Sequence, residues 1–187
     1  DEASSRYIAA SHLVNFNTEG AIASLMRAVK NTSPDLDNRI VRRKAVESLG
    51  RLKVEAALPL FESCLTDEDN YPVENAVWAI GEIGTTETTT LETLAQQLER
   101  DSQSYRTIIH ALAALKYEPA ADRIEKFVTS DSAPIASAAL SALYQLKGDE
   151  QAIVKVLGFL QSKNVNARRG SIQDLIDAGY FKAIPNI

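Results

Sequence analysis

The chain has 187 residues, enough for one domain with a sizeable buried core. Its 20 Lys and Arg against 25 Asp and Glu give a net charge of −5, which argues against a general nucleic-acid-binding protein. The single cysteine, Cys64, excludes an internal disulfide and a multi-cysteine metal site, and the apolar runs are too short to cross a membrane. The first four residues also lack the basic and apolar regions of a signal peptide.

One pattern recurs along the chain: an apolar helix, a short polar break and a second amphipathic helix. The clearest copy runs from Val41 to Leu65. Aligned on this copy, apolar positions recur every 31 to 36 residues, at Leu13, Leu49, Ile80, Leu112, Leu143 and Leu175. Two flanking positions repeat with them, at Ala9, Ala45, Ala76, Ile108, Ala139 and Ser171, and at Phe16, Leu52, Ile83, Leu115, Leu146 and Ala178. A fixed period in this range is typical of an all-α solenoid of stacked helix pairs.

The breaks between helices divide the chain into six repeats. We expect a single domain over residues 1–187, with repeats at about 4–30, 38–66, 70–99, 102–130, 133–162 and 165–187. Residues 31–37 form an additional surface loop, and the threonine-rich stretch 85–90 has poor helix propensity, so the helix after it should begin near Leu91. The last repeat is incomplete, and we expect further protein or a partner to continue the stack.

Two rows of residues lie opposite the buried stripe. With Ala45 at the centre of the core face, helical geometry places Arg43 and Glu47 on the far side. Carried through the repeats, the first row is Tyr7, Arg43, Glu74, Arg106, Ser137 and Arg169. The second row is Ser11, Glu47, Trp78, His110, Ser141 and Gln173, with Tyr144 one turn from Ser141. We interpret both rows as one exposed surface, rich in arginine and containing the single tryptophan.

Each row residue also has a structural interpretation. The Trp78 ring could lie across the helix of the neighbouring repeat rather than cover a ligand. Arg43, Glu74 and Arg106 alternate in sign and could form a ladder between stacked helices, an interpretation that is weaker for Arg169. His110 has the near-neutral pKa of a proton donor, but a lone histidine is more often structural.

Other residue types indicate no catalytic or metal site. Cys64 lies on an apolar helix and is expected to be a buried structural thiol. His12 is expected to pack at the flank of its helix's buried stripe. The sequence contains no glycine-rich phosphate loop, no His-x-x-x-His pair and no Cys-x-x-Cys, so we expect no metal and no prosthetic group.

Three runs carry a family resemblance: RRKAVESLGRL at 42–52, NYPVENAVWAIGEIG at 70–84 and NVNARRGSIQD at 164–174. The first two resemble the E/F-type phycobilin lyases, which are HEAT-repeat proteins, and the third looks like the phycoerythrin-associated branch of that family. The resemblance implies a HEAT-like α-solenoid in which the helix of the Val-Arg-x-x-Ala pattern lines the concave face, so that both rows lie in the groove. It also implies a cyanobacterial cytoplasm or plastid stroma.

The resemblance implies attachment of a linear tetrapyrrole, phycoerythrobilin or phycocyanobilin, to a cysteine of a phycobiliprotein subunit, in some members with isomerisation. It further implies an F-type HEAT partner, and relatives in this branch are longer. Combining the rows with this chemistry, we expect Arg106, Arg169 and Arg43 to hold the propionates and Trp78 with Tyr71 or Tyr144 to stack on the pyrrole plane. Glu74 or Glu47 would accept the pyrrole N–H groups, and His110 or Tyr71 would relay a proton, which makes Glu74, His110 and Tyr71 the catalytic candidates.

Three other functions compete with this hypothesis. A non-catalytic HEAT protein could hold a phycobiliprotein subunit for a separate lyase, and it would bind the apo-subunit without stoichiometric bilin. A generic HEAT scaffold would offer its concave surface to a peptide or helix. A HEAT-like DNA glycosylase is disfavoured by the net charge of −5.

Overall fold

The computed structural model describes residues 2–67, 70–101 and 103–182, without the side chains of Asn70 and Tyr71. Its regular elements are α-helices and short 3-10 turns, with no strand among these residues, which confirms the all-α prediction. The chain forms two compact units, residues 1–94 and 95–187. None of the helices in the described ranges is long and apolar enough to cross a bilayer.

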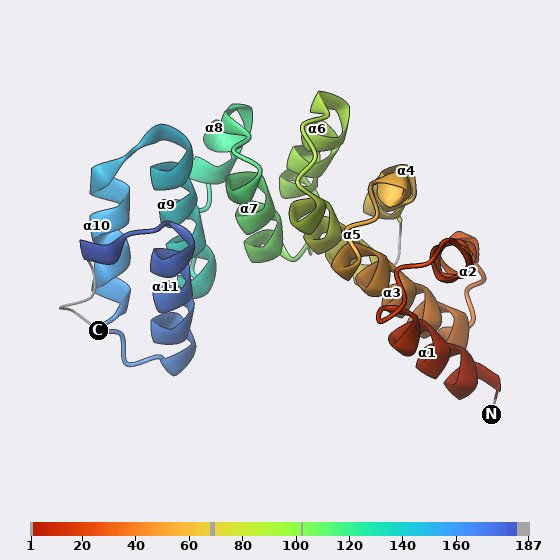
Figure 1. Cartoon of the computed structure of the whole chain (residues 1–187). Coiled ribbons are helices and arrows are strands. Elements are labelled where there is room, and N and C mark those ends of the chain that lie inside the picture. Colours follow the sequence, from red (N-terminus) through yellow and green to blue (C-terminus); the bar gives the residue numbers. More distant parts are fainter. Residues whose placement is uncertain (1, 68–69, 102, 183–187) are drawn as a thin grey trace. The chain divides into compact units, whose positions relative to one another are not determined.

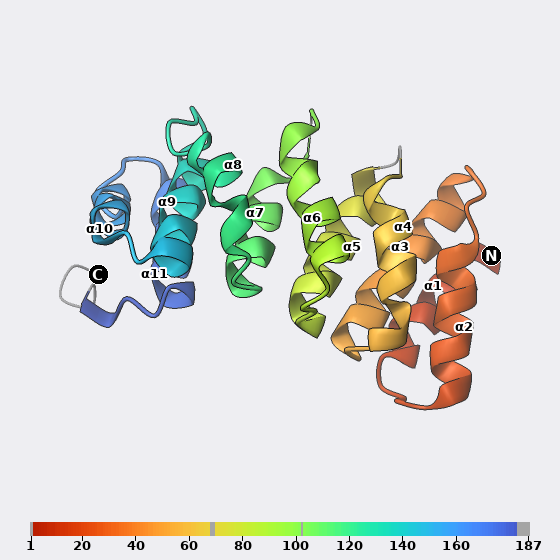
Figure 2. The same ribbon diagram turned by 90° about the horizontal axis from the view of Figure 1, so that it is seen from above.

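Unit 1 is a stack of helix pairs. Helices α1, α3 and α5 follow one another in one layer, and α2, α4 and α6 lie in the other (Figures 1 and 2). The bounds are α1 Glu2–Leu13, α2 Glu19–Lys30, α3 Leu36–Arg51, α4 Leu58–Leu65, α5 Asn70–Ile83 and α6 Thr88–Gln96, with a 3-10 turn at Glu55–Ala57 before α4. Each helix therefore buries its apolar side against its sequence neighbours, as a solenoid requires.

Unit 2 shows the same alternation of helices within itself. Helix α9 contacts α7 before it and α11 after it, and α8 and α10 also pack on α9. The bounds are α7 Tyr105–Ala114, α8 Ala121–Glu125, α9 Ala133–Lys147, α10 Glu150–Phe159 and α11 Val165–Asp177, with 3-10 turns at Gln97–Glu99 and Glu118–Ala120. Because neighbours cover it on several sides, α9 is buried over much of its length, from Ala136 to Leu143.

The predicted turn chemistry appears at the helix ends. The Thr18 hydroxyl accepts a hydrogen bond from the Ala21 amide at the start of α2, and the Asp149 carboxylate caps α10 by accepting from two amides. Gly148 ends α9 in a left-handed conformation, with φ of 71°, that a side chain would strain. These residues satisfy backbone groups that the helices leave unpaired.

The register of the repeats is confirmed except in the first copy. The aligned positions Ala45 and Leu49, like their equivalents in later copies, are buried, whereas Ala9 is exposed and Phe16 is 57% exposed. Helix α1 instead buries Ala10, whose carbonyl accepts a hydrogen bond of 2.8 Å from the Ser48 hydroxyl of α3. This polar contact places the neighbouring face of α1 against α3, one residue later than the alignment predicted.

Helix α6 begins earlier than predicted. It starts at Thr88, not near Leu91. Thr90 is fully buried and its hydroxyl donates to the Glu62 carboxylate of α4. This tertiary contact outweighs the low helix propensity of threonine, so the helix gains its first turn. The predicted loop at 31–37 is real but shorter, since α3 already begins at Leu36.

Helices α3 and α5 lie in close contact at Gly50. A Cβ atom at this position would lie 2.7 Å from the Ala79 Cβ, 3.0 Å from the Ala79 Cα and 2.9 Å from Cζ3 of Trp78. Only glycine lets the two backbones come this close. The Trp78 ring therefore lies against α3 of the preceding repeat. This is the structural alternative to a ring that covers a ligand.

We expect Gly50→Ala to destabilise unit 1 by about 1–3 kcal/mol, because the new methyl group meets backbone atoms of α5 that cannot rotate away. Chemical denaturation followed by Trp78 fluorescence measures the change. Gly20→Ala is the matched control: nothing lies within 4 Å of its Cβ position, so stability should stay equal or rise slightly. Equal stability of both variants would contradict the close approach.

Candidate functional site

Asp174 of α11 is the centre of a buried polar cluster in unit 2. Its carboxylate is fully buried and accepts hydrogen bonds from the Arg106 guanidinium, one of them 3.2 Å long, and from the Ser137 hydroxyl. His110 Nε2 lies 3.1 Å from Asp174 Oδ1, and His110 Nδ1 lies 3.5 Å from Asp177 Oδ2. Three helices, α7, α9 and α11, thus converge on one carboxylate.

The partners of Asp174 decide its charge. Burial alone raises the pKa of this carboxyl, but the hydrogen bonds from His110, Arg106 and Ser137 outweigh burial and leave the pKa below its ordinary value. Arg106 also donates to the backbone carbonyls of Pro134 and Gly170. The guanidinium that we expected to hold a propionate already has a carboxylate and two carbonyls as partners.

The interpretation of both rows as one exposed surface is wrong in the fifth repeat. Ser137 and Ser141 are fully buried, and both hydroxyls bond Asp174, one at the carboxylate and one at the backbone carbonyl. The reason is that α9 has helices packed on several sides, so that its row positions face a neighbour instead of solvent. In this repeat the rows belong to the contact between helices.

The other row residues are spread over different environments. Glu47 forms ion pairs of 2.9 Å with Lys44 and with Arg51 of its own helix. Glu74 and Arg169 are exposed. The Tyr144 ring meets the Tyr180 ring edge-on, with centroids 5.7 Å apart. The side chain of Tyr71 lies outside the described residues.

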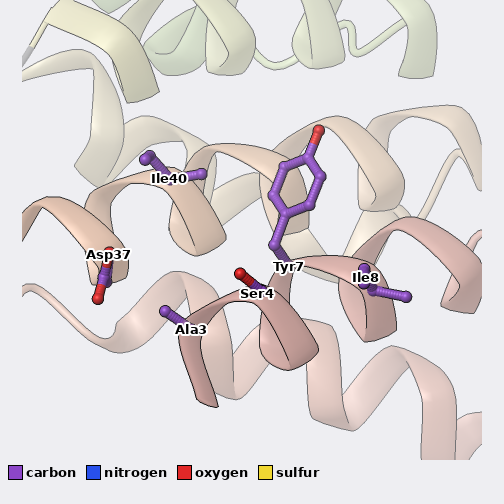
Figure 3. Close-up of a pocket in the computed structure, with 6 residues that line it drawn as sticks. All are labelled: Ala3, Ser4, Tyr7, Ile8, Asp37 and Ile40. Atoms are coloured by element: carbon purple, nitrogen blue, oxygen red, sulfur yellow. The ribbon is translucent and has the colours of Figure 1, made fainter. Parts of the chain in front are cut away.

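Two adjoining pockets open between α1 and α3 in unit 1. One, of about 370 Å³, is lined by Ala3, Ser4, Tyr7, Ile8, Asp37 and Ile40 (Figure 3). The other, of about 350 Å³, is lined by Tyr7, Leu36, Arg39, Ile40 and Arg43. Tyr7 and Ile40 belong to both pockets. The predicted propionate ligand Arg43 therefore lies beside an apolar, aromatic-lined depression.

Cys64 is confirmed as a buried thiol. Burial raises its pKa above the ordinary value, although Arg42, whose Nη2 is 3.5 Å from the sulfur, opposes that rise. Arg42 is itself buried and also bonds the Val29 carbonyl and the Asp67 carboxylate, so it connects α2, α3 and the end of α4.

The expectation for His12 is wrong: the side chain is exposed because α1 buries its other face.

Sequence reasoning gave no role to Asp174 and Arg39, and none to Tyr7, although Tyr7 stands in the first row. Asp174 carried a usable signal, since it stands directly before the core residue Leu175 and three residues after the aligned position Ser171. A carboxylate in such a place needs cationic and hydroxyl partners. Arg39 carried a signal too, because it stands four residues before Arg43 and so lies on the same helix face one turn away. Among the described residues no group of three or more histidine, cysteine or acidic side chains could hold a metal ion.

Comparison with known proteins shows the family of the chain. A family model described as HEAT repeats matches residues 1–69 and 35–113. The chain is 30% identical over 200 residues to the "Phycocyanobilin lyase subunit alpha" of Picosynechococcus sp. (strain ATCC 27264 / PCC 7002 / PR-6), covering 98% of this chain and 74% of that protein. The chain belongs to the HEAT-repeat E/F-type phycobilin lyase family.

Other relatives agree with this assignment. The chain is 56% identical over 186 residues to the "Uncharacterized phycocyanin operon protein Y" of Pseudanabaena tenuis (strain PCC 7409), and it spans 44% of that protein's length. A chain in the solved structure titled "The structure of the complex of CpcE and CpcF of phycocyanin lyase from Nostoc sp. PCC7120" superposes with a TM-score of 0.85 at 26% identity. That match covers 98% of this chain and 74% of the other, which confirms the HEAT-like solenoid.

Replacing Asp174 by Asn should destabilise unit 2 by about 3 kcal/mol, because Arg106 loses its buried carboxylate partner. Since folding lowers the pKa of Asp174, its stabilising effect is complete above the unfolded pKa of about 4 and is lost as the pH falls through the lower folded pKa.

Urea denaturation of wild type and Asp174→Asn at pH 7 and at pH 3 measures this linkage, and the difference between the two proteins should shrink at the lower pH. Asp122→Asn is the control, because Asp122 is an exposed carboxylate of the same unit that pairs with Lys147 on the surface. A difference that is the same at both pH values would contradict the charged state of Asp174.

Proposed function

We propose that this chain is part of a phycobilin lyase of the E type, which attaches a linear tetrapyrrole to a cysteine of a phycobiliprotein subunit. The observation that carries the proposal is the alignment with a phycocyanobilin lyase alpha subunit over nearly the whole chain, supported by the TM-score of 0.85. The chain spans less than half of the Pseudanabaena relative, so activity, substrate and partner are proposed for the protein of which this chain is a part or the whole.

The reaction needs little chemistry from the lyase itself. The acceptor cysteine's sulfur forms a bond to the ethylidene carbon of the bilin, and its proton is returned to the tetrapyrrole, so S–H adds across a double bond without oxidant or reductant. The nucleophile belongs to the substrate protein, in agreement with the buried, raised-pKa thiol of Cys64. Much of the acceleration comes from holding bilin and acceptor in register.

Several residues have proposed roles in this reaction. In unit 1, exposed Glu74 is suited to accept pyrrole N–H groups. In unit 2, His110 is suited to relay a proton, and the carboxylates of Asp174 and Asp177 fix its orientation. For a propionate, Arg43 of unit 1 is the exposed candidate. Arg169 of unit 2 is also exposed, whereas Arg106 of the same unit is bonded to a buried carboxylate. The finer parts of the proposal are a phycoerythrin-type acceptor, an F-type HEAT partner and a cytoplasmic or stromal location.

Purified chain mixed with phycocyanobilin, and separately with phycoerythrobilin, tests the proposal by visible absorption and fluorescence. Binding should produce a red-shifted, sharper absorption band that saturates at one bilin per chain. Addition of an apo-phycobiliprotein subunit and an F-type partner should then give a denaturation-resistant pigment on the subunit, and none when the acceptor cysteine is replaced by serine.

A chain that binds the apo-subunit but changes the spectrum of neither bilin would overturn the lyase proposal in favour of a HEAT chaperone or scaffold. A chain that binds bilin but yields no adduct with any partner present would equally remove the catalytic assignment.

A further inference from the structure

The exposed large apolar side chains in the described part of unit 1 lie together, with the exception of Phe16. Tyr7 and Ile8 of α1 and Leu36 and Ile40 of α3 are all large, apolar and exposed, with Leu36 at 67% and Ile8 at 54%. All four line the two adjoining pockets between α1 and α3. Clustered exposed apolar area of this kind marks a binding surface more often than scattered residues do.

The geometry of the two pockets suits one extended, flat ligand. Each has a volume near 350 Å³, and they adjoin at Tyr7 and Ile40. In Figure 3 the Tyr7 ring extends away from the α1 backbone, which offers an aromatic face to a molecule lying along the depression. Together the two pockets fall in the size range of small-molecule sites.

The two pockets differ in the charge of the residues that line them. The charged residues that line the pocket at Leu36 are Arg39 and Arg43, one turn apart on α3, whereas Asp37 lines the other pocket. Two guanidinium groups beside an aromatic and aliphatic wall complement a planar apolar molecule that carries two carboxylates. Guanidinium groups bind carboxylates in a two-pronged manner, which also fixes the ligand's orientation.

We infer that this surface, formed by Tyr7, Leu36, Arg39, Ile40 and Arg43, is the subsite for the propionate-bearing middle of the linear tetrapyrrole. The inference rests on the proposed function, because that function supplies a ligand with a flat conjugated body and two adjacent propionates. Arg39 and Arg43 bind the propionates, and the Tyr7 ring stacks on a pyrrole. The terminal ring on the Ile8 side then extends over the pocket that contains Asp37.

The test compares phycocyanobilin with its dimethyl ester, in which both carboxylates are masked but the conjugated body is unchanged. Wild type should bind the ester about tenfold more weakly than the free acid. Arg43→Gln should weaken binding of the free acid about tenfold and leave binding of the ester unchanged, because the interaction it removes is already absent there. Tyr7→Leu should weaken binding of both ligands by a similar factor.

Arg27→Gln is the matched control, since Arg27 is an exposed arginine of unit 1 on α2 that lines neither pocket. It should bind both ligands like wild type. Circular dichroism of every variant verifies that the helices are intact.

The outcomes separate this subsite from the proposed function. If wild type binds bilin but Arg43→Gln and Tyr7→Leu bind it equally well, the subsite is wrong while the lyase proposal stands. If these variants lose affinity only for an apo-phycobiliprotein subunit, the surface docks protein and the inference is overturned. If wild type binds no bilin at all, the proposed function fails and the subsite with it.

Discussion

Two buried charged side chains, Arg42 in unit 1 and Asp174 in unit 2, connect helices that no strand or disulfide joins in the described part of the chain. Asp174 receives partners from α7 and α9, and Arg42 binds groups of α2 and the end of α4. A buried charge costs several kcal/mol unless its partners are placed well, so each cluster favours the helix arrangement that supplies all its partners. The apolar seams between helices stabilise without direction, because burial of apolar area does not require one particular pair of atoms to meet. The charges therefore specify the register that the apolar residues stabilise.

The different roles of polar and apolar contacts explain which sequence-based expectations succeeded. The all-α solenoid follows from apolar positions that recur in every copy, such as Leu49, Ile80 and Leu112, and these are buried. The failures occur where a single polar contact between helices overrides the local pattern. Ser48 bonding the Ala10 carbonyl rotates the expected register of α1, and Thr90 bonding Glu62 extends α6. Periodicity describes one helix at a time and carries no information on such contacts.

In the candidate site, too, helical periodicity did not predict contacts between helices. Helical geometry correctly put Arg43 opposite the core, but it could not tell that Ser137 and Ser141, at equivalent positions, are covered by α11. Nor could it show that Arg106 faces a carboxylate 68 residues later in the chain. These hydrogen bonds depend on where α7, α9 and α11 meet in space. Tyr7 and Arg43, both row residues, line one pocket together, and the second arginine there, Arg39, lies outside both rows.

The boundary between the two compact units falls between Leu94 and Ala95, inside α6, where both side chains are fully buried. Helix α6 runs through this point without a loop, so a chain divided there would be cut through a helix. When a gene gains or loses repeats, the segment that can be added or removed is consequently the helix pair rather than either unit. Members of such a lineage can differ by whole repeats in length while preserving the contacts between neighbours, and variation in the number of repeats is the change that this architecture tolerates best.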